Sequence, residues 1–292
     1  MSAPRSAVVV VSHETRDEAL ACLATLHEAG ADEVVLVDCG STDATAAAVR
    51  ATHADVEVIA LENVGYGRGA NAGVAATTAP HVVVANADTR FSPGSVGALV
   101  AALQGDDGIG AAGPLVRYPD GRIQASARRF PALHEAAAHA LLGLWWPRNR
   151  WTRRYRELDE DPRRERDVDW LSGCAMALRR RAFESIDGFD PAYFLYVEDV
   201  DLAFRLREEG WRIRYVPGAE VVHAVGASTR RRPRLRMLVE HARSLDRFFG
   251  RRLATGHARW LRPLVRFGLA VWVAIAFAWG LLTGRGRSTT GE

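Results

Sequence analysis

The sequence of 292 residues contains no lysine, so arginine supplies all 38 of its strongly basic side chains. Cysteine is also scarce: Cys22, Cys39 and Cys174 are an odd number, widely spaced and without a CxxC pair. The first thirty residues hold no cleavable hydrophobic segment. These absences argue against a secreted scaffold held together by disulfide bonds, and they predict a reducing, cytoplasmic environment.

Positive charge is scarce in the first part of the chain. Residues 1–119 carry six arginines against fourteen Asp and Glu residues, whereas residues 120–292 carry 32 arginines against 21 acidic residues. A basic surface is therefore expected in the second part, where nucleic acid, anionic lipid or a diphosphate substrate would each fit. The overall composition, 48% hydrophobic and 25% charged, is that of a globular protein and excludes a disordered or fibrous one.

Short apolar runs alternate with helical spacing over the first 110 residues. Residues 7–11 are an uninterrupted apolar run, typical of a strand buried on both faces, and residues 17–29 have apolar side chains at helical spacing. The same alternation predicts strands at 33–38, 56–61 and 81–86, and helices ending near 49, over 69–77 and over 93–103. Strands alternating with helices predict an α/β domain whose mostly parallel sheet has helices on both faces.

The pattern becomes irregular beyond residue 110. A turn is expected at 118–121, and a polar, arginine-rich linker at 148–166. Further along, the sequence predicts a strand at 168–171, a helix at 200–209, and strands at 211–216 and 221–223.

The longest uncharged run near the end of the chain is residues 267–282, sixteen residues with arginines on both sides. At 1.5 Å per residue such a helix spans roughly 24 Å, whereas about 20 residues are needed to cross a bilayer comfortably. Trp272 and Trp279 lie seven residues apart and therefore on one face of the helix. We expect a basic helical tail at 231–292 whose apolar segment lies in the membrane interface, with a buried core helix as the alternative.

Two of the predicted strands end in carboxylates, at the edge where parallel sheets bind ligands. Asp38 stands where it can accept a hydrogen bond from a nucleobase or a ribose hydroxyl, and Gly40 lets a ligand approach the backbone. Asp88 is a hard oxygen ligand that can hold Mg²⁺ or Mn²⁺ against a diphosphate. There are structural alternatives: Ser41 and Asp43 can cap the next helix, and an aspartate at a strand end is often a turn residue.

A glycine-rich segment follows the third predicted strand. Gly65, Gly67 and Ala70 fit the G-x-G-x-x-G/A dinucleotide fingerprint, and Asp88 lies at a distance that imitates its ribose-binding acid. A nucleotide-dependent oxidoreductase is therefore an alternative. Because the glycines follow the third strand rather than the first, the segment indicates a nucleotide more than a dinucleotide.

Three acids, Glu198, Asp199 and Asp201, begin a predicted helix directly after an aromatic-rich loop. Acids favour helix N-termini, which accounts for Glu198 or Asp201. An aromatic platform beside a carboxylate also describes a sugar site, in which one carboxylate deprotonates a hydroxyl group. His223 follows at the end of a short strand, as a structural histidine or a metal ligand.

Several segments together carry a resemblance to a known family: VDCGSTD, ENVGYGRGANAG, NAD, VDWLSGCAMALRR, GFDPAYFLYVEDVDLAFR and VVHAVGAST. In this order they resemble the inverting family-2 glycosyltransferases of the GT-A fold, over roughly residues 7–230. GAAGPLVRYPDGRIQASARRFPAL and WWPRNRWTRRYRE are similar to the actinobacterial members that add L-rhamnose to N-acetylglucosaminyl-diphospho-decaprenol. The resemblance implies a GT-A domain at 1–230, with a nucleotide-binding half at 1–110 and an acceptor half at 111–230.

The resemblance also implies roles for matching residues. Asp38 would contact the thymine or uracil of a nucleotide-sugar, and Asp199, beside Glu198, would be the catalytic base. Asp88 would be the last residue of a DxD-like motif and would bind Mg²⁺ or Mn²⁺ together with His223. The other donor-side residues would be Ser12, Gly40, Ser41, Asn63, Gly69 and Asn86, and the acceptor-side residues Trp170, Gly173 and Cys174. Two residues depart from the family pattern. Asn86 replaces the first Asp of the DxD motif, and Cys39 stands where Asn is common.

The implied activity is inverting transfer of L-rhamnose from dTDP-L-rhamnose to a polyprenyl-diphospho-GlcNAc acceptor in cell-wall or polysaccharide biosynthesis. The implied partners are a nucleotide-sugar, this lipid-linked acceptor and the cytoplasmic membrane surface, with no nucleic acid and with the oligomeric state left open. Transfer of another hexose or of galactofuranose from a UDP-sugar is the alternative within the family. A catalytically silent membrane adaptor is an alternative of another class.

Overall fold

The structure, a computed structural model, describes residues 5–143, 145–224, 234–254 and 256–282. The predicted domain boundary between residues 230 and 231 lies outside the described residues, as does the tail beyond residue 282.

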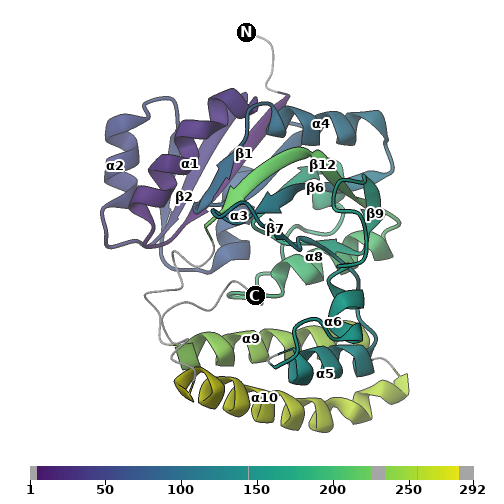
Figure 1. Cartoon of the computed structure of the whole chain (residues 1–292). Helices are drawn as coiled ribbons and strands as arrows, with labels where there is room; N and C mark the ends of the chain where they lie inside the picture. Colours follow the sequence, from purple (N-terminus) through teal and green to yellow (C-terminus); the bar gives the residue numbers. More distant parts are fainter. Residues whose placement is uncertain (1–4, 144, 225–233, 255, 283–292) are drawn as a thin grey trace.

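A ten-stranded sheet forms the centre of the molecule, in the order β3-β2-β1-β4-β11-β6-β12-β5, with β7 on β6 and β9 on β12 (Figure 1). Its first half is four parallel strands, β1 (Ser6–Ser12), β2 (Glu33–Cys39), β3 (Glu57–Leu61) and β4 (His81–Asn86). Val8, Val9 and Val10 of β1 have no exposed surface, because helices cover both faces of the sheet. The predicted α/β fold with a mostly parallel sheet is confirmed, and so are the four strands expected in the first half.

The second half of the sheet is mixed. β6 (Ile109–Arg117) and β12 (Arg212–His223) are parallel, and β11 (Ala175–Arg179) runs antiparallel between β4 and β6. The short strands are β5 (Thr89–Phe91), β7 (Ile123–Gln124), β9 (Arg166–Val168), and the separate pair β8 (Ala127–Arg128) and β10 (Trp170–Leu171).

The expectation of irregular chain after residue 110 is wrong for β6 and β11. Both contain small residues with weak strand propensity, such as Ala111 and Ala112, and form strands because sheet neighbours pair on both sides of them. The strands predicted at 211–216 and 221–223 are a single strand, β12. It bends where its register against β6 shifts between Val216 and Glu220.

Helices pack on both faces of the sheet. One face, with Val8 and Val10, is covered by α1 (Arg16–Ala29), α2 (Thr45–Thr52) and α4 (Ser95–Gly105). The face with Val9 and Val11 is covered by α3 (Tyr66–Ala75), α7 (Arg180–Glu184) and α8 (Glu198–Glu208).

Three helices start two or more residues away from their predicted starts, and one predicted cap is absent; α4 begins at Ser95 rather than at 93. α3 begins at Tyr66 rather than at 69, and α8 at Glu198 rather than at 200. At the start of α2, the Asp43 carboxylate accepts the Thr45 amide hydrogen at 3.1 Å, as a capping residue would. Ser41 does not cap the helix, because its hydroxyl donates to Asp38 instead.

A second layer of helices lies below the sheet domain in Figure 1. It contains α5 (Leu133–Leu142), α6 (Arg150–Tyr155), α9 (Arg234–Phe248) and α10 (Arg262–Leu282), with a π-helical turn (Phe249–Leu253) and a 3₁₀ turn (Gly256–Leu261) between α9 and α10. The predicted linker at 148–166 is therefore partly helical. The Asn149 side chain caps α6 by accepting the amide hydrogens of Trp151 and Thr152 at 3.1 and 3.0 Å.

α10 is longer than the uncharged run that predicted it, because its first turns include Arg262 and Arg266. In the part of the chain that the structure describes, Arg259–Leu281 is the one helical stretch long and apolar enough to cross a membrane by length and composition. Only 11% of it is buried, which argues against the alternative of a core helix. α10 packs along α9. Arg262 and Arg266 of α10 both pair with Asp246 of α9, at 3.1 and 3.0 Å.

The tail is joined to the loop before α8. Phe248 packs against Tyr193 and Val197, and the Ser244 hydroxyl donates to the Leu195 carbonyl at 3.0 Å. α9 therefore holds in place the segment that leads into Glu198 and Asp199.

Candidate active site

The carboxyl ends of β1, β2 and β4 lie side by side, as the parallel register requires. Ser12 is the register partner of Asp38, and Asn86 is the partner of Val11. The Asp38 carboxylate is buried and is held by its own loop, accepting hydrogen bonds from the Ser41 amide, at 3.2 Å, and the Ser41 hydroxyl. A ligand that bonds to Asp38 must compete with Ser41 or share the carboxylate with it.

Asn63 lies across this edge from a residue that the sequence analysis did not select. Its side-chain nitrogen is 3.2 Å from Nε2 of His13, whose Nδ1 is 2.8 Å from the Cys39 carbonyl. His13 directly follows β1, so the rule that drew attention to Asp38 and Asp88, a polar residue at a strand end, could have found it.

β12 brings His223 to Asp88. Its last residue pairs with Thr89 of β5, and Nε2 of His223 is then 3.2 Å from Oδ1 of Asp88. Nδ1 lies 3.2 Å from the Gln124 side-chain oxygen. Burial opposes a charge on His223, but its contacts with Cys174 and Asp88 raise its pKa to about 10.

A carboxylate and an imidazole this close fit a divalent cation, which would displace the proton from Nε2 of His223 on binding. Among the described residues, no group of three or more His, Cys, Asp and Glu side chains is arranged around a common point. Asp88 and His223 alone therefore make an incomplete shell, which the oxygens of a bound diphosphate can complete.

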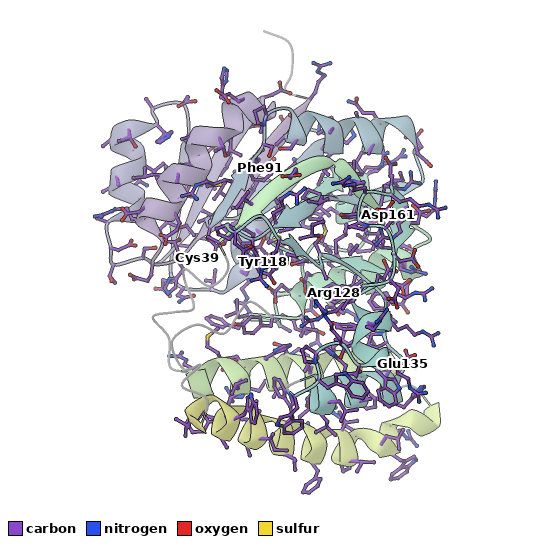
Figure 2. The ribbon with its side chains drawn as sticks, viewed as in Figure 1. Cys39, Phe91, Tyr118, Arg128, Glu135 and Asp161 are labelled. Atoms are coloured by element: carbon purple, nitrogen blue, oxygen red, sulfur yellow. The ribbon has the colours of Figure 1, made fainter. Side chains whose placement is uncertain are left out.

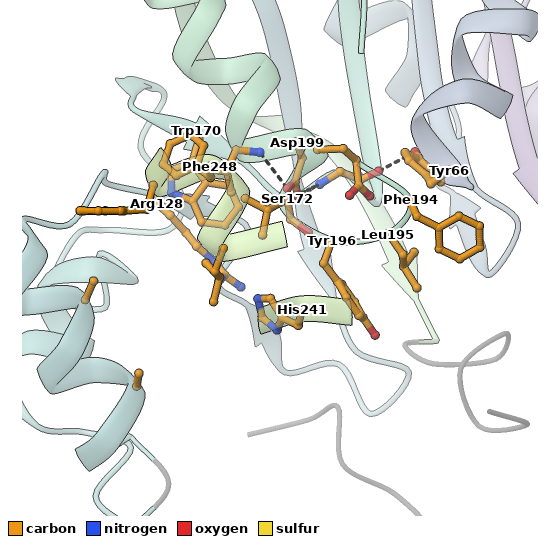
Figure 3. A pocket seen from close by; sticks show the side chains of 18 of the residues that line it. Tyr66, Arg128, Trp170, Ser172, Phe194, Leu195, Tyr196, Asp199, His241 and Phe248 are labelled. Atoms are coloured by element: carbon orange, nitrogen blue, oxygen red, sulfur yellow. Dashed lines mark hydrogen bonds between the residues drawn. The ribbon is translucent and has the colours of Figure 1, made fainter. Parts of the chain in front are cut away.

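Glu198 and Asp199 open α8, and their environments differ. Both oxygens of Asp199 accept backbone hydrogen bonds, Oδ2 from Gly173 at 2.9 Å and Oδ1 from Val200 at 2.8 Å (Figure 3). Glu198 is buried, and its Oε2 has no hydrogen-bond partner. Burial first, and the charge of Asp199 second, raise the pKa of Glu198 to about 8.

This contrast assigns the charge within the pair. Burial also raises the pKa of Asp199, but the two amide hydrogen bonds stabilise its anion. A proton shared by the pair therefore favours Glu198, and Asp199 is the member whose anion the backbone stabilises.

The backbone before this pair is strained. Tyr196 and Val197 both have φ of 67°, in the left-handed region that a β-branched residue such as valine rarely adopts. Each such residue costs on the order of 1–3 kcal/mol and persists only when its surroundings fix it. Val197 is buried against Phe248 of α9, which supplies that constraint.

The predicted acceptor-side residues line the same space. Gly173 lies under Asp199, and a side chain there would begin 3.1 Å from the Asp199 Cβ, so only glycine fits comfortably. Its carbonyl accepts the Tyr66 hydroxyl at 2.8 Å, and the Cys174 carbonyl accepts the Asn86 amide at 2.9 Å. Trp170 is buried and donates from Nε1 to the Arg129 carbonyl at 3.1 Å.

One cavity of about 1070 Å³ joins these features. It extends from the strand ends past Asp199 and into the helical layer below. The predicted site residues that line it are Ser12, Asn63, Asn86, Asp88, Trp170, Gly173, Cys174, Glu198, Asp199 and His223. The predicted donor-side residues Asp38, Gly40, Ser41 and Gly69 do not line it.

The glycine-rich segment serves packing in this structure. At Gly65, φ is 89°, and a Cβ would lie 2.2 Å from the Phe194 carbonyl oxygen, so the aromatic loop crosses directly over this glycine. A Cβ on Gly69 would lie 2.7 Å from Sγ of Cys39, which lets α3 pack against the sheet. The crowding at Gly65, and at Gly67, where a Cβ would lie 3.0 Å from the Phe189 Cβ, accounts for the glycines that the dinucleotide fingerprint would use to approach a phosphate.

The lower end of the cavity is lined by residues that the sequence motifs did not single out. Arg128, Arg156 and His139 come from the region read as irregular chain and linker, and His241 from the tail. Figure 2 places Arg128 between the sheet domain and the helical layer. Composition indicated a basic second half but could not show which of its arginines face inward.

Comparison with known proteins gives consistent matches. The family described as "Glycosyltransferase like family 2" matches residues 4–243. The N-acetylglucosaminyl-diphospho-decaprenol L-rhamnosyltransferase of Mycobacterium tuberculosis H37Rv is 41% identical over 248 residues, 81% of this chain and 79% of that relative. Rhamnosyltransferase WbbL of Escherichia coli K12 is 34% identical over 98 residues, 34% of each chain.

Solved structures share the fold. The mannosyltransferase PcManGT of Pyrobaculum calidifontis, in complex with GDP-Man and Mn²⁺, has a TM-score of 0.57 at 20% identity and covers 98% of this chain and 80% of that one. TarS of S. aureus, residues 1–349, has a TM-score of 0.53 at 14% identity and covers 99% and 94%. At these identities the likeness establishes the fold alone.

Proposed function

Since this chain belongs to glycosyltransferase family 2, we propose that it transfers L-rhamnose from dTDP-L-rhamnose to a polyprenyl-diphospho-GlcNAc acceptor, with inversion at the anomeric carbon. The observation that carries the proposal is the position of Asp199. It stands midway along a cavity that runs from the nucleotide-binding edge of the sheet to an apolar helical layer, where a base between a donor and a lipid-linked acceptor would stand. The curated relative at 41% identity supplies the names of the sugar and the acceptor.

The proposed reaction is a single displacement. Asp199 accepts the proton of an acceptor hydroxyl group as that oxygen attacks the anomeric carbon from the face opposite the leaving group. A bond forms between this oxygen and the anomeric carbon, the bond from the carbon to the diphosphate oxygen breaks, and its electron pair leaves with dTDP. Gly173 and Val200 hold the two carboxylate oxygens in place through their amide hydrogens.

We propose that Asp88 and His223 hold a divalent cation, Mg²⁺ or Mn²⁺. The cation would supply charge neutralisation for the departing diphosphate. Gln124 orients His223 from behind by contacting its second ring nitrogen, the support that metal-binding histidines usually have.

On the donor side, Asn63 and Ser12 line the cavity and can bond to the nucleotide. Asp38, with Gly40 and Ser41, would contact the base after the loop adjusts, because the Asp38 carboxylate is held by Ser41. We place the glycosyltransferase domain at 1–230, with a nucleotide-binding half at 1–110 and an acceptor half at 111–230.

We propose that the tail attaches the enzyme to the cytoplasmic membrane surface. Trp260, Leu264 and Phe267 are 74, 66 and 67% exposed, as an interface-facing surface would be. A spanning α10 would draw its partner α9, with Asp246 and Arg243, towards the hydrocarbon, which is costly for charged groups. A helix lying in the interface avoids this cost.

The test is transfer from a panel of donors, dTDP-L-rhamnose, UDP-galactofuranose and other UDP-hexoses, to a short-chain prenyl-diphospho-GlcNAc, with Mg²⁺ or with chelator. The proposal expects metal-dependent product from dTDP-L-rhamnose, with inverted configuration by NMR. Product from a UDP-sugar alone would show that the donor is that sugar nucleotide rather than dTDP-L-rhamnose. Absence of product from every donor would contradict the proposed activity. Extraction of membranes with alkaline carbonate should release the protein; retention would indicate a spanning helix.

A further inference from the structure

Arg128 and Arg156 face the lower half of the cavity without a direct ion pair among the described residues, although the charge of Arg128 acts on Asp199 at longer range. Nε of Arg128 donates to the Ala125 carbonyl at 3.0 Å, and its guanidinium lies over the Trp170 ring, 4.9 Å from the centroid. The Arg156 side chain makes no hydrogen bond to the residues that the structure describes, and its Nε is buried without a partner among them. Among the described residues, neither guanidinium lies within ion-pair distance of a carboxylate.

This arrangement is unfavourable without a further anion. Burial and the charge of Arg128 both lower the pKa of Arg156, so the two guanidinium groups repel each other. The chain pairs most of its other inward arginines; Arg166, for example, bonds to Glu157 at 2.9 Å. Both side chains are half-buried and face the cavity, so a ligand bound there can supply the missing negative charge.

The other basic groups near these arginines are neutral. His139 and His241 also line the cavity, and burial lowers the pKa of each to about 4, helped by the charges of Arg156 and Arg128 at His139 and of Arg128 at His241. The two arginines are therefore the positive charges available to a ligand here, while the imidazoles can donate or accept hydrogen bonds. Figure 3 shows Arg128, His241 and Asp199 around one space.

Beyond the arginines the cavity wall becomes apolar. Three helical elements supply it: Leu141 comes from α5, Leu245 and Phe248 from α9, and Phe267 and Val271 from α10. Along the cavity, a carboxylate base is therefore followed by two positive charges, those of Arg128 and Arg156. An apolar groove comes next and opens beside the exposed helix α10. This matches the order of a sugar, a diphosphate and an isoprenoid chain in a lipid-linked sugar.

Building on the proposed function, we propose that Arg128 and Arg156 bind the diphosphate of the acceptor and that the groove between α5, α9 and α10 holds its first isoprene units. Arginine presents several donors in a plane and suits diphosphate oxygens at two points. The tail then has a second task, since it forms one wall of the acceptor site as well as contacting the membrane.

The direct test is binding of farnesyl diphosphate to the full-length protein in detergent, by calorimetry and without any donor. We expect R128Q and R156Q each to weaken binding by about tenfold or more. R153Q changes an exposed arginine of α6, the helix that ends just before Arg156; it pairs with Asp159 outside the cavity, and the variant should bind as the wild type does. Wild-type affinity in both R128Q and R156Q would overturn the proposal.

Three further ligands separate the sources of the binding energy. Inorganic pyrophosphate should bind more weakly than farnesyl diphosphate and remain sensitive to R156Q, and farnesol should bind without sensitivity to it. Vesicles of phosphatidylglycerol should bind R156Q and the wild type alike. Vesicle binding that falls in R156Q, with no effect on farnesyl diphosphate, would assign the arginines to membrane lipid and overturn the proposal.

Kinetics distinguish failure of this proposal from failure of the proposed function. In the transfer assay, R156Q should raise the KM for the lipid-linked acceptor about tenfold and leave the KM for the donor unchanged. Rhamnosyl transfer with an unchanged acceptor KM would overturn the diphosphate site and keep the function. If neither the wild type nor any variant transferred rhamnose while farnesyl diphosphate still bound, the proposed function would be overturned and the diphosphate site would be kept.

Discussion

Nε of Arg252, in the π-helical turn after α9, donates to Oδ1 of Asp201 in α8 at 2.7 Å, and the Asp201 side chain has no exposed surface. Asp201 also accepts from Arg205 at 2.7 Å and from the Tyr193 hydroxyl at 3.2 Å. Asp201, the third acid at the start of α8, is therefore held by partners of its own and has a structural role. It fixes the tail to the helix that carries Asp199.

Replacing Arg252 by methionine should release this attachment. Asp201 keeps Arg205, so we expect a loss of about 1.5–3 kcal/mol in the free energy of unfolding, the range for a hydrogen bond to a charged group. Denaturant unfolding in detergent measures it. The control is R251M, which removes the half-exposed partner of Asp190 and should cost at most about 1 kcal/mol. Equal losses in the two variants would contradict a special role for Arg252.

Glu198 should make the stability of the protein depend on pH. Its pKa is about 8 in the folded chain, against a usual value of 4.5. Between these values the unfolded chain releases a proton that the folded chain keeps, so unfolding becomes easier as pH rises, by up to about 1.4 kcal/mol per pH unit. Below 4.5 both states are protonated, and the effect disappears.

The measurement is the free energy of unfolding of the wild type and of E198Q from pH 4 to pH 9. Glutamine keeps the shape and cannot ionise, so E198Q should become progressively more stable than the wild type as pH rises to about 8. A difference between the two proteins that does not change with pH would show that Glu198 ionises normally.

Gly65 should tolerate no side chain, because the Phe194 carbonyl occupies its Cβ position at 2.2 Å. We expect G65A to displace the loop before Glu198 and to reduce transfer by at least about tenfold, since misplacing a base by 1 Å can cost about 10²-fold. The matched control is G94A: Gly94 also has positive φ, at 72°, but has open space around its Cβ position. It should lose only about 1–2 kcal/mol of stability, with normal activity. Equal activity in the two variants would refute the crowding argument.

Asp88 should control the affinity for the divalent cation. D88N keeps the size of the side chain and removes its charge. The Mn²⁺ concentration that gives half-maximal transfer should therefore rise at least about tenfold. Mutation of residues that only support a metal ligand already lowers metal affinity by about 10–100-fold. Titration of chelator-treated protein with Mn²⁺ in the transfer assay measures this. An unchanged midpoint would place the cation elsewhere.

The sequence predicts the first half of the fold well because each strand there is a continuous apolar run. β1 illustrates this: Val8, Val9 and Val10 are buried on both faces, and no polar residue interrupts them. β6 was missed because Ala111, Ala112 and Gly113 have no strand signal of their own and become a strand through pairing with β11 and β12.

The candidate site shows the same division. Asp88, Asp199 and His223 were found because they stand at element ends in short, specific motifs, and the structure places them along one cavity. Arg128 and Arg156 could not be selected among 38 arginines, since facing a cavity depends on how α6 and the tail pack against the sheet domain. Asp38 was found by its position, but the hydrogen bond from Ser41 that restrains it is visible only in the structure.

The most direct test of the account is the transfer rate of D199N with dTDP-L-rhamnose and a short-chain prenyl-diphospho-GlcNAc. The account predicts a kcat lower by about 10²–10⁴-fold, the usual loss when a general base is removed, with protection against thermal unfolding by dTDP unchanged. The control is D187N, which changes an exposed acid between α7 and α8 and should leave kcat at the wild-type value. A D199N variant with the wild-type kcat would contradict the assignment of Asp199 as the base.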